Sequence, residues 1–386
     1  MKNKLKLVVL LDASRAYDRD LLTGITNYNK LHDKFVFFFH SPKYIHDENV
    51  DTLFKRIIDW KPDGIFTREI GGLKKLLGLN IPIIIAPHTK LYKDHINLWG
   101  DENGIGRMVG EHFIKKGYKN FAFLGFKDFQ WSLERQAGFV EYLQKNGHVV
   151  SEFIFDNNKM LWESLPAKFQ AWLKTLAIPC AVFAATDELN VPLLEAAHTT
   201  GLKVPGDISI IGVDNDTMIC EMSNPTLSSV SHNAVQAGFQ AALALSRWME
   251  YGQKPAANIM MEVGTIITRN STNALALDDE HVRTALHYIA NMAASEDISV
   301  EDVVKATVVS RRVLEKKFQT VIKSSILEEI KRVRIERIKF LLGNSDLSVQ
   351  QIAFELNFRN FENITRYFKQ YTGLKPLEYR NKMAKS

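Results

Sequence analysis

Residues 353–380 read AFELNFRNFENITRYFKQYTGLKPLEYR. The pattern predicts a short helix over residues 349–356 and a tight turn at NFRN, after which Ile364 and Phe368 recur at the spacing of one helix face. Asn357 lies in a turn that favours a positive φ angle, which asparagine tolerates better than most residues. A short helix, a turn and a second helix with a polar outer face predict a helix-turn-helix unit.

The same layout occurs once more, about 50 residues earlier. Residues 300–305 are predicted to be helical, and a second helix follows in SRRVLEKKFQ, with Ser310 at its N-cap. Residues 326–342 have the length and apolar spacing of one long connecting helix. The tail therefore carries a duplicated helix-turn-helix unit.

Polar and basic side chains cover the outer face of the second helix of each unit. Arginine and lysine on such a face can reach guanine edges or phosphates in the DNA major groove. The predicted DNA-binding residues are Ser310, Arg311, Arg312, Glu315 and Lys316 in the first unit, and Phe361, Glu362, Thr365, Arg366 and Lys369 in the second.

The distribution of charge agrees with a nucleic-acid partner. Residues 298–386 hold 18 Lys and Arg against 10 Asp and Glu, a net charge of +8, whereas residues 1–297 have a net charge of −3. A basic module on a near-neutral body is typical of DNA-binding proteins. On these residues, the whole tail from about Asp279 to Lys382 resembles the AraC-type DNA-binding domain, from which it departs at Asn357, where that family usually has glycine.

The first 270 residues alternate short apolar runs with amphipathic stretches, which predicts parallel α/β units. The expected strands cover residues 6–11, 35–39, 64–66, 81–85, 120–125, 181–185 and 208–213. The apolar run at the N-terminus is short and meets Asp12, so a buried first strand is expected rather than a signal peptide. Residues 270–279 (NSTNALALDD) are polar and without a pattern. The predicted domains are therefore residues 1–272, a linker over 273–279, and residues 280–386.

Three blocks of this front half resemble the sensor domain of lactose-repressor-type regulators, which is similar to periplasmic sugar-binding proteins. They are GDENGIGRMVGEHFIKKGYKNFAFLG (residues 100–125), AATDELN followed by GLKVPGDISIIGVDN (residues 184–215), and NPTLSSVSHN (residues 224–233). The resemblance covers about Leu5 to Thr272 and implies two lobes that hold a small molecule between them.

A lactose-repressor-type sensor followed by an AraC-type reader resembles the xylose operon regulators, as does RAYDR at residues 15–19. The resemblance implies a sugar-responsive transcription regulator, with D-xylose as the leading effector, duplex DNA as partner, a cytoplasmic location and a homodimer. An activator that contacts RNA polymerase is favoured over a repressor, and a different sugar stays open. No cofactor and no metal are expected, since the two cysteines and the scattered histidines form no ligand cluster.

The candidate ligand-binding residues follow from the same resemblance. Arg135 and Asp214 match the two principal sugar positions of that family, and His232 matches a third position where glutamine is commoner. Carboxylates and guanidinium groups suit sugar hydroxyls, and aromatic rings stack on the CH face of a sugar. The remaining candidates come from their places in the chain: Ser14, Arg15 and Asp18 lie in the first strand–helix loop, and Thr186 and Asp187 end another strand. Trp131 and Trp99 are the candidates for stacking on the sugar ring.

Several of these residues have a plainer alternative. Asp187 could cap the helix that follows it, Trp99 could belong to the core, and Arg15 could be a surface charge. Asp101 is expected to order the start of the helix near Gly104 rather than to bind ligand.

Two other classes of protein fit the sequence less well. An enzyme lacks support because the sequence contains no phosphate-binding glycine loop, nucleophile elbow or zinc-binding HExxH motif. A transport binding protein would need an export signal and would not carry a DNA reader.

Overall fold

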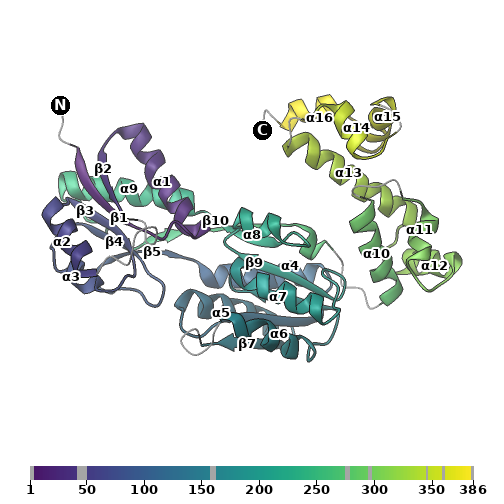
Figure 1. The fold of residues 1–386 in the computed structure, drawn as a ribbon, viewed down its shortest axis with the longest axis horizontal. Coiled ribbons are helices and arrows are strands. Elements are labelled where there is room, and N and C mark those ends of the chain that lie inside the picture. The colour runs from purple at the N-terminus through teal and green to yellow at the C-terminus, as the bar shows by residue number, and fades with distance from the viewer. Residues whose placement is uncertain are drawn as a thin grey trace. The chain divides into compact units, whose positions relative to one another are not determined.

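The computed structural model describes residues 4–40, 50–156, 162–273, 279–293, 298–344, 347–358 and 361–383. The chain divides into two compact units, and along the chain the boundary lies between Thr272 and Asn273. The first, the α/β unit, contains two six-stranded sheets, one in each of two lobes. In the second, the helical unit, the described residues form helices and no strand (Figure 1). The predicted fold class is confirmed.

The sheet of the first lobe has the strand order β11-β5-β4-β3-β1-β2, and all its pairs are parallel. Helices α1, α2, α3 and α9 pack on it. The bounds of the elements of this lobe are β1 Leu5–Leu10, α1 Ala16–His32, β2 Phe35–Phe39, α2 Val50–Trp60, β3 Gly64–Arg68, α3 Leu73–Leu77, β4 Ile83–Ala86, β5 Ile96–Gly100, α9 Ala234–Tyr251 and β11 Ile259–Met261.

Both faces of this sheet are buried, which explains the continuous apolar runs of its strands. Successive residues of β1 point to opposite faces. Leu7 and Val9 pack with α1 and α9, which lie side by side in Figure 1, whereas Val8 and Leu10 pack with α2 and α3.

The second lobe has the strand order β12-β10-β9-β8-β6-β7, parallel except for the antiparallel pair of β10 and β12. Its elements are α4 Glu102–Lys115, β6 Asn120–Phe126, α5 Gln130–Lys145, β7 Val150–Phe155, η1 Trp162–Ser164, α6 Leu165–Leu173, β8 Cys180–Ala184, α7 Asp187–Thr199, β9 Ile208–Val213, α8 Thr217–Met222, β10 Ser228–His232, β12 Val263–Ile267 and η2 Asn270–Thr272.

The chain passes between the lobes three times, because consecutive elements belong to different sheets. The crossings follow β5, β10 and β11, and the last one returns the chain to the second lobe in β12. The sequence pattern predicted a structureless segment from residue 270 onward, and this prediction was wrong for its first three residues. Asn270–Thr272 is the 3-10 helix η2, in which Ser271 and Thr272 are buried. Residues 274–278 of the expected linker lie outside the described residues.

The helical unit contains two small cores joined by one long helix. The bounds are α10 Glu280–Met292, α11 Val300–Lys305, α12 Arg311–Val321, α13 Ile326–Asn344, α14 Val349–Glu355, α15 Phe361–Thr372 and α16 Pro376–Met383. The N-terminal half of α13 packs with α10–α12, and its C-terminal half packs with α14–α16. Asp279 caps α10, accepting hydrogen bonds from the backbone of His281 and Val282. None of the described helices is long and apolar enough to cross a membrane.

Candidate functional site: a cleft between the lobes and two exposed helices

A cleft with about 680 Å³ of empty space, part of it open to solvent, lies between the two lobes of the α/β unit. It is lined at the carboxyl ends of strands from both sheets, where ligands bind in open α/β folds. The lining residues are Arg15, Ala16, Tyr17, Arg68, Pro87, His88, Leu98, Trp99, Gly100, Glu102, Trp131, Arg135, Thr186, Asp187, Glu188, Asp214, Asp216 and Ile219.

Arg135 is a buried cation on the second-lobe side of the cleft. Its Nε donates to Glu102 Oε2 at 2.6 Å, its Nη1 donates to the Ala185 carbonyl at 2.5 Å, and its guanidinium lies 4.8 Å from the Trp131 ring centroid. Close packing of α4 on α5 makes this possible, because a Cβ on Gly106 would lie 2.1 Å from the Arg135 carbonyl oxygen. The sequence had singled out Arg135 and Trp131, and both line the cleft.

Asp214 faces Arg135 from the loop after β9. Its Oδ2 accepts from Thr186 Oγ1 at 3.0 Å, and its Oδ1 lies 3.9 Å from Arg135 Nη2. Burial alone would raise the pKa of Asp214, but the hydrogen bond from His232 and the charge of Arg135 outweigh it and hold the pKa below its usual value. The carboxylate is therefore ionised at neutral pH and can accept hydrogen bonds from a bound hydroxyl group.

The backbone at Asp214 is strained, since its φ is +101° and that of the next residue, Asn215, is +48°. Left-handed angles at residues other than glycine cost about 1–3 kcal/mol and persist only where the surroundings enforce them. Here the Asp214 amide donates to the Val230 carbonyl, and the Asn215 amide donates to Ser229 Oγ. The strain turns the Asp214 carboxylate toward the cleft.

His232 lies behind this pair and is not among the residues that line the cleft. Its Nε2 lies 3.0 Å from Arg135 Nη2 and 3.1 Å from Asp214 Oδ1. One nitrogen cannot serve both neighbours: with a proton it donates to Asp214, and without one it accepts from Arg135. The Tyr17 ring of the first lobe packs edge-on against His232, with centroids 5.4 Å apart.

The first lobe contributes Arg68 and Tyr17, which the sequence analysis missed. Arg68 Nε lies 2.8 Å from Asp18 Oδ1, and the guanidinium lies 4.7 Å from the Tyr17 ring centroid. Asp18 is fully buried and also accepts from the Asp12 amide, so this predicted ligand residue orients Arg68 and does not line the cleft.

The other candidates differ in their positions. Ser14 is exposed, donates to Asp12 Oδ1 and does not line the cleft, whereas Arg15 is exposed and lines it. Trp99 is buried and lines the cleft, and its Nε1 donates to Glu134 Oε2 across the lobes at 3.0 Å. Asp101 Oδ1 accepts from the Gly104 amide at 2.8 Å, which confirms its predicted role at the start of α4.

Asp187 lines the cleft and does not act as a cap for α7. Its Oδ2 accepts from the Asp216 amide at 2.9 Å and from Cys220 Sγ at 3.5 Å. Burial, together with the neighbouring Asp214 carboxylate, raises the pKa of Asp187 to about 8. The cleft therefore holds a neutral carboxyl group beside an ionised one at neutral pH.

His88 is another lining residue that the sequence analysis missed. Burial and the charges of Arg68 and Arg15 lower its pKa to about 3, so the ring is neutral at physiological pH. Its carbonyl accepts from the Gln130 amide of the second lobe at 3.2 Å. His88 follows β4 with no local motif around it, and only the assembled cleft identifies it.

In the helical unit, α12 and α15 each follow a short helix and a turn, as predicted. Asn357 has a φ of +55°, so the expected left-handed turn is confirmed. Ser310 is the N-cap of α12, although its side chain makes no capping hydrogen bond. Leu314 and Phe318, like Ile364 and Phe368 in α15, face inward.

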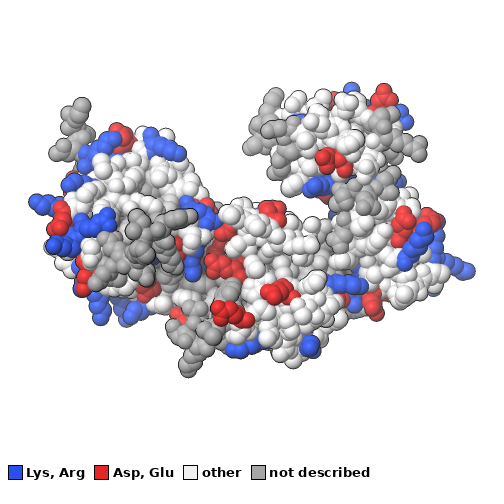
Figure 2. All heavy atoms as spheres, in the orientation of Figure 1, with Lys and Arg blue, Asp and Glu red and all other residues white. Residues whose placement is uncertain are grey.

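The two arginines at the start of α12 differ in their ion pairs. Arg311 is paired with Glu301 and Glu315, whereas no ion pair involves Arg312 among the described residues. Figure 2 shows Lys and Arg atoms gathered over α12, with acidic atoms beside them. The remaining candidates on exposed or half-buried helical positions are Lys316, Phe361, Glu362, Thr365, Arg366 and Lys369.

Comparison with known proteins supports both units. Residues 111–272 match a periplasmic binding protein-like domain, and residues 303–382 match a helix-turn-helix domain. The chain is 28% identical to a xylose operon regulatory protein from Haemophilus influenzae, over 97% of this chain and 98% of that protein. A protein of the same name from Escherichia coli K12 is 26% identical, with 97% of both chains covered.

Solved structures agree in fold. The structure of the xylose-binding transcription activator xylR superposes with a TM-score of 0.81, at 24% identity and 98% coverage of both chains. A transcriptional regulator CelR–cellobiose complex matches 70% of this chain and 86% of that one, with a TM-score of 0.56 at 19% identity. The family resemblance inferred from the sequence is confirmed: the chain is a DNA-binding transcription regulator that joins a periplasmic-binding-protein-like domain to a C-terminal helix-turn-helix domain, and it is similar along nearly its whole length to the xylose operon regulatory proteins.

Proposed function

We propose that the chain is a xylose-responsive activator of pentose-utilisation genes, in which D-xylose binds in the cleft and the helical unit binds promoter DNA. One observation carries the sugar site: buried Arg135 and ionised Asp214 face each other in a cleft that also contains Trp99 and Trp131. A guanidinium and a carboxylate satisfy hydroxyl groups that both donate and accept, and indole rings suit the CH faces of a pyranose. The names of the full-length relatives supply the sugar.

The candidate ligand-binding residues differ in how directly they would contact the sugar. Arg15, Trp131, Arg135, Asp187 and Asp214 line the cleft and are assigned to the sugar. His232 and Asp18 would act indirectly, because His232 contacts the lining residue Asp214 and Asp18 contacts the lining residue Arg68. Ser14 contacts Asp12 and receives the weakest support.

The DNA-binding surface is assigned to α12 and α15. Two helix-turn-helix units in one chain suit successive major-groove segments, about one helical turn apart. Arg312, Lys316, Arg366 and Lys369 are exposed cations on these helices and are the proposed contacts to bases and phosphates. Arg311 contributes less, since two carboxylates already engage it.

Assembly and location complete the proposal. A homodimer would present four helix-turn-helix units to the promoter, and contact with RNA polymerase would account for activation. We place the regulator in the cytoplasm, where its DNA is, and assign residues 1–272 to sensing, 273–279 to the linker and 280–386 to DNA binding. Sedimentation at micromolar concentration, with and without promoter DNA, tests the dimer, and a strict monomer in both conditions would contradict it.

Asp214→Asn tests the sugar site and keeps a residue that tolerates a positive φ. We expect the loss of about 2–4 kcal/mol of xylose binding, because a charged acceptor of two hydrogen bonds is removed. Calorimetric titration with pentoses and hexoses measures this loss and identifies the effector. Promoter affinity without sugar should stay at the wild-type level, since the helical unit is unchanged.

The matched control is Glu141→Gln, which removes a carboxylate from an exposed position of α5. It should bind xylose as the wild type does. If Asp214→Asn responds to sugar at wild-type concentrations, Asp214 is structural and the sugar binds elsewhere. If another sugar binds tightly and xylose does not bind, the effector is that other sugar, and the assignment of the cleft as the sugar site stands.

A further inference from the structure

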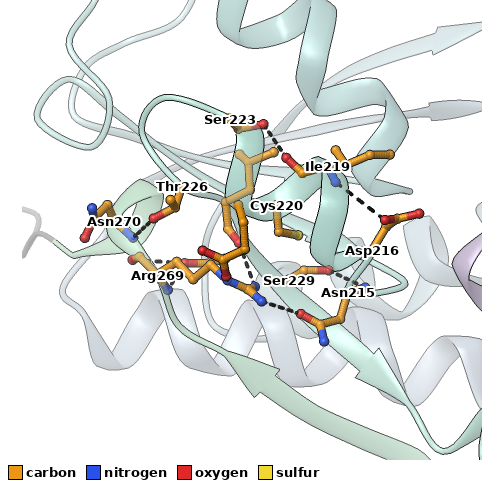
Figure 3. A network of polar contacts seen from close by, with 12 residues as sticks. Asn215, Asp216, Ile219, Cys220, Ser223, Thr226, Ser229, Arg269 and Asn270 are labelled. Carbon is orange, nitrogen blue, oxygen red and sulfur yellow. Dashed lines mark hydrogen bonds and ion pairs between the residues drawn. The ribbon is translucent and has the colours of Figure 1, made fainter. Parts of the chain in front are cut away.

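Arg269 lies just after β12, near the C-terminal end of the α/β unit, and its guanidinium makes three contacts. Nη2 donates to Asn215 Oδ1 at 2.9 Å, Nη1 donates to the Leu227 carbonyl at 2.9 Å, and Nε donates to Glu221 Oε1 at 2.6 Å (Figure 3). The Arg269 side chain is only 11% exposed, whereas that of Glu221 is 57% exposed. The contact with Asn215 is therefore the better shielded of its two side-chain contacts.

Asn215 is the residue that follows Asp214, and both have left-handed backbone angles. The Asn215 amide is fixed by Ser229 Oγ at 3.0 Å, and the Asp216 amide is fixed by Asp187 Oδ2 at 2.9 Å. Among the described residues, the hydrogen bond from Arg269 is the one that engages the Asn215 side chain. It links the strained loop that carries Asp214 to a residue more than 50 positions further along the chain.

The backbone beyond Arg269 is held to the same part of the second lobe. Ser271 Oγ donates to the Ile210 carbonyl at 2.7 Å and accepts from the Ser228 amide at 2.8 Å. Ser228 Oγ also contacts Thr272 Oγ1 at 2.6 Å. Figure 3 shows the Arg269 side chain reaching Asn215, whereas Asn270 lies against Thr226. Residues 269–272 thus form a segment fastened to β9 and β10, and the chain leaves the α/β unit from its end.

We propose that Arg269 is a positioning residue that couples occupancy of the cleft to this exit segment. A ligand that binds Asp214 changes the position of the 214–216 loop, and Arg269 transmits that change because it contacts the loop through Asn215 and belongs to the exit segment itself. A chain of physical contacts that has distinct arrangements can carry energetic coupling between two sites, and the chain from Asp214 through Asn215 to Arg269 is a short one. The inference rests on the proposed function, since it explains how a sugar at Asp214 alters DNA binding.

The sharpest test removes the Asn215 side chain and leaves its backbone unstrained. Asn215→Gly does this, because glycine adopts a φ of +48° readily. Three quantities are measured on the full-length chain: the Kd for D-xylose, the Kd for promoter DNA without sugar, and the ratio of DNA affinities with and without saturating xylose. We expect the DNA affinity ratio to fall at least five-fold toward one, with the sugar-free DNA Kd unchanged.

Arg269→Gln and the double variant complete the cycle. Arg269→Gln should lower the ratio similarly, and the double variant should lower it no further, because both changes break the same Arg269–Asn215 hydrogen bond. Glu221→Gln is the matched control: it removes the exposed partner of the same guanidinium and should keep the wild-type ratio. A role in stability alone would lower the melting temperature in Asn215→Gly and leave the ratio unchanged.

The outcomes separate this inference from the proposed function. If the wild type binds no xylose in calorimetry, the proposed effector is wrong. If the wild type binds xylose and responds to it, but Asn215→Gly and Arg269→Gln keep the wild-type ratio at saturating sugar, the coupling role of Arg269 is overturned. Additive losses in the double variant would overturn it too, because the two residues would then act independently.

Discussion

Arg19 Nη2 lies 2.9 Å from Asp216 Oδ2, and these two residues belong to opposite lobes of the α/β unit. Arg19 is on α1 of the first lobe, where it also donates to the Ser14 carbonyl. Asp216 is the N-cap of α8 in the second lobe, and its Oδ1 accepts from the Met218 amide. The ion pair therefore joins the two lobes directly and depends on how close they lie.

Arg19→Gln should weaken sugar binding although Arg19 does not itself line the cleft, because it breaks an ion pair that joins the two lobes. The Arg19 side chain is 38% exposed, so solvent screens the pair and we expect a loss of about 0.2–1 kcal/mol. Calorimetry with D-xylose at low and high salt measures it, and the difference from wild type should shrink at high salt. Lys4→Gln, which breaks an exposed pair with Asp33 inside the first lobe, is the control. An unchanged Kd in Arg19→Gln would mean that the pair does not favour closure.

Arg312→Ala and Arg366→Ala should each weaken promoter binding by about 1–3 kcal/mol if the arginine pairs with a guanine. Arg311→Ala should cost less, because Glu301 and Glu315 already bind its guanidinium. Anisotropy titrations against promoter and unrelated duplexes separate base contacts from phosphate contacts. Lys115→Gln removes one positive charge from the α/β unit and serves as control. Wild-type affinity and sequence preference in both alanine variants would exclude α12 and α15 from reading DNA.

Asp187 should make the α/β unit less stable as the pH rises. The pKa of Asp187 is raised to about 8 in the folded state, so between pH 4 and 8 the folded chain holds a proton that the unfolded chain has released. Stability falls across that window by up to about 1.4 kcal/mol per pH unit from this group. Asp187→Asn removes this titrating group. Urea unfolding at several pH values should show that the free energy of unfolding of the variant, relative to that of the wild type, increases as the pH rises. Parallel pH curves for the two proteins would contradict an elevated pKa.

Asn357→Gly should leave DNA binding intact and preserve or increase stability, since glycine adopts the φ of +55° without strain. Asn357→Ala should cost about 1–2 kcal/mol, because a Cβ without a polar group is disfavoured in the left-handed region. Scanning calorimetry of the full-length chain measures both variants. Equal melting curves for the glycine and alanine variants would show that the turn is not strained.

Much of the fold could be predicted from local pattern, and the failures have physical causes. The central strands β1, β6, β8 and β9 and the helices α11–α15 are apolar runs or strongly periodic segments, and the sequence identified them within a few residues. Strand β10, Ser228–His232, was missed because SSVSH is polar. Ser228 and Ser229 are buried, and their hydrogen-bond partners come from η2 and from the loop after β9. The three-residue β11 carries too short a pattern to be detected.

The cleft could be predicted only in part. Arg135 and Asp214 belong to recognisable sequence blocks, whereas Tyr17, Arg68 and His88 come from three separate segments of the first lobe and share no motif. Glu102 was missed because its partner depends on how closely α4 approaches α5. A residue whose role depends on the meeting of distant segments leaves no local signal.

The three passages between the lobes also determine how late in synthesis on the ribosome each lobe can complete its fold. The sheet of the first lobe lacks its last strand until Ile259–Met261 has been made, and that of the second lobe waits for Val263–Ile267. Until then the edges of β5 and β10 are bare, and bare strand edges promote aggregation. The helical unit does not have to wait for a distant segment, because each of its two cores is formed by one contiguous stretch of the chain. Nascent chains that stop before residue 267 should therefore need chaperones, whereas the DNA-reading end can fold as soon as it emerges.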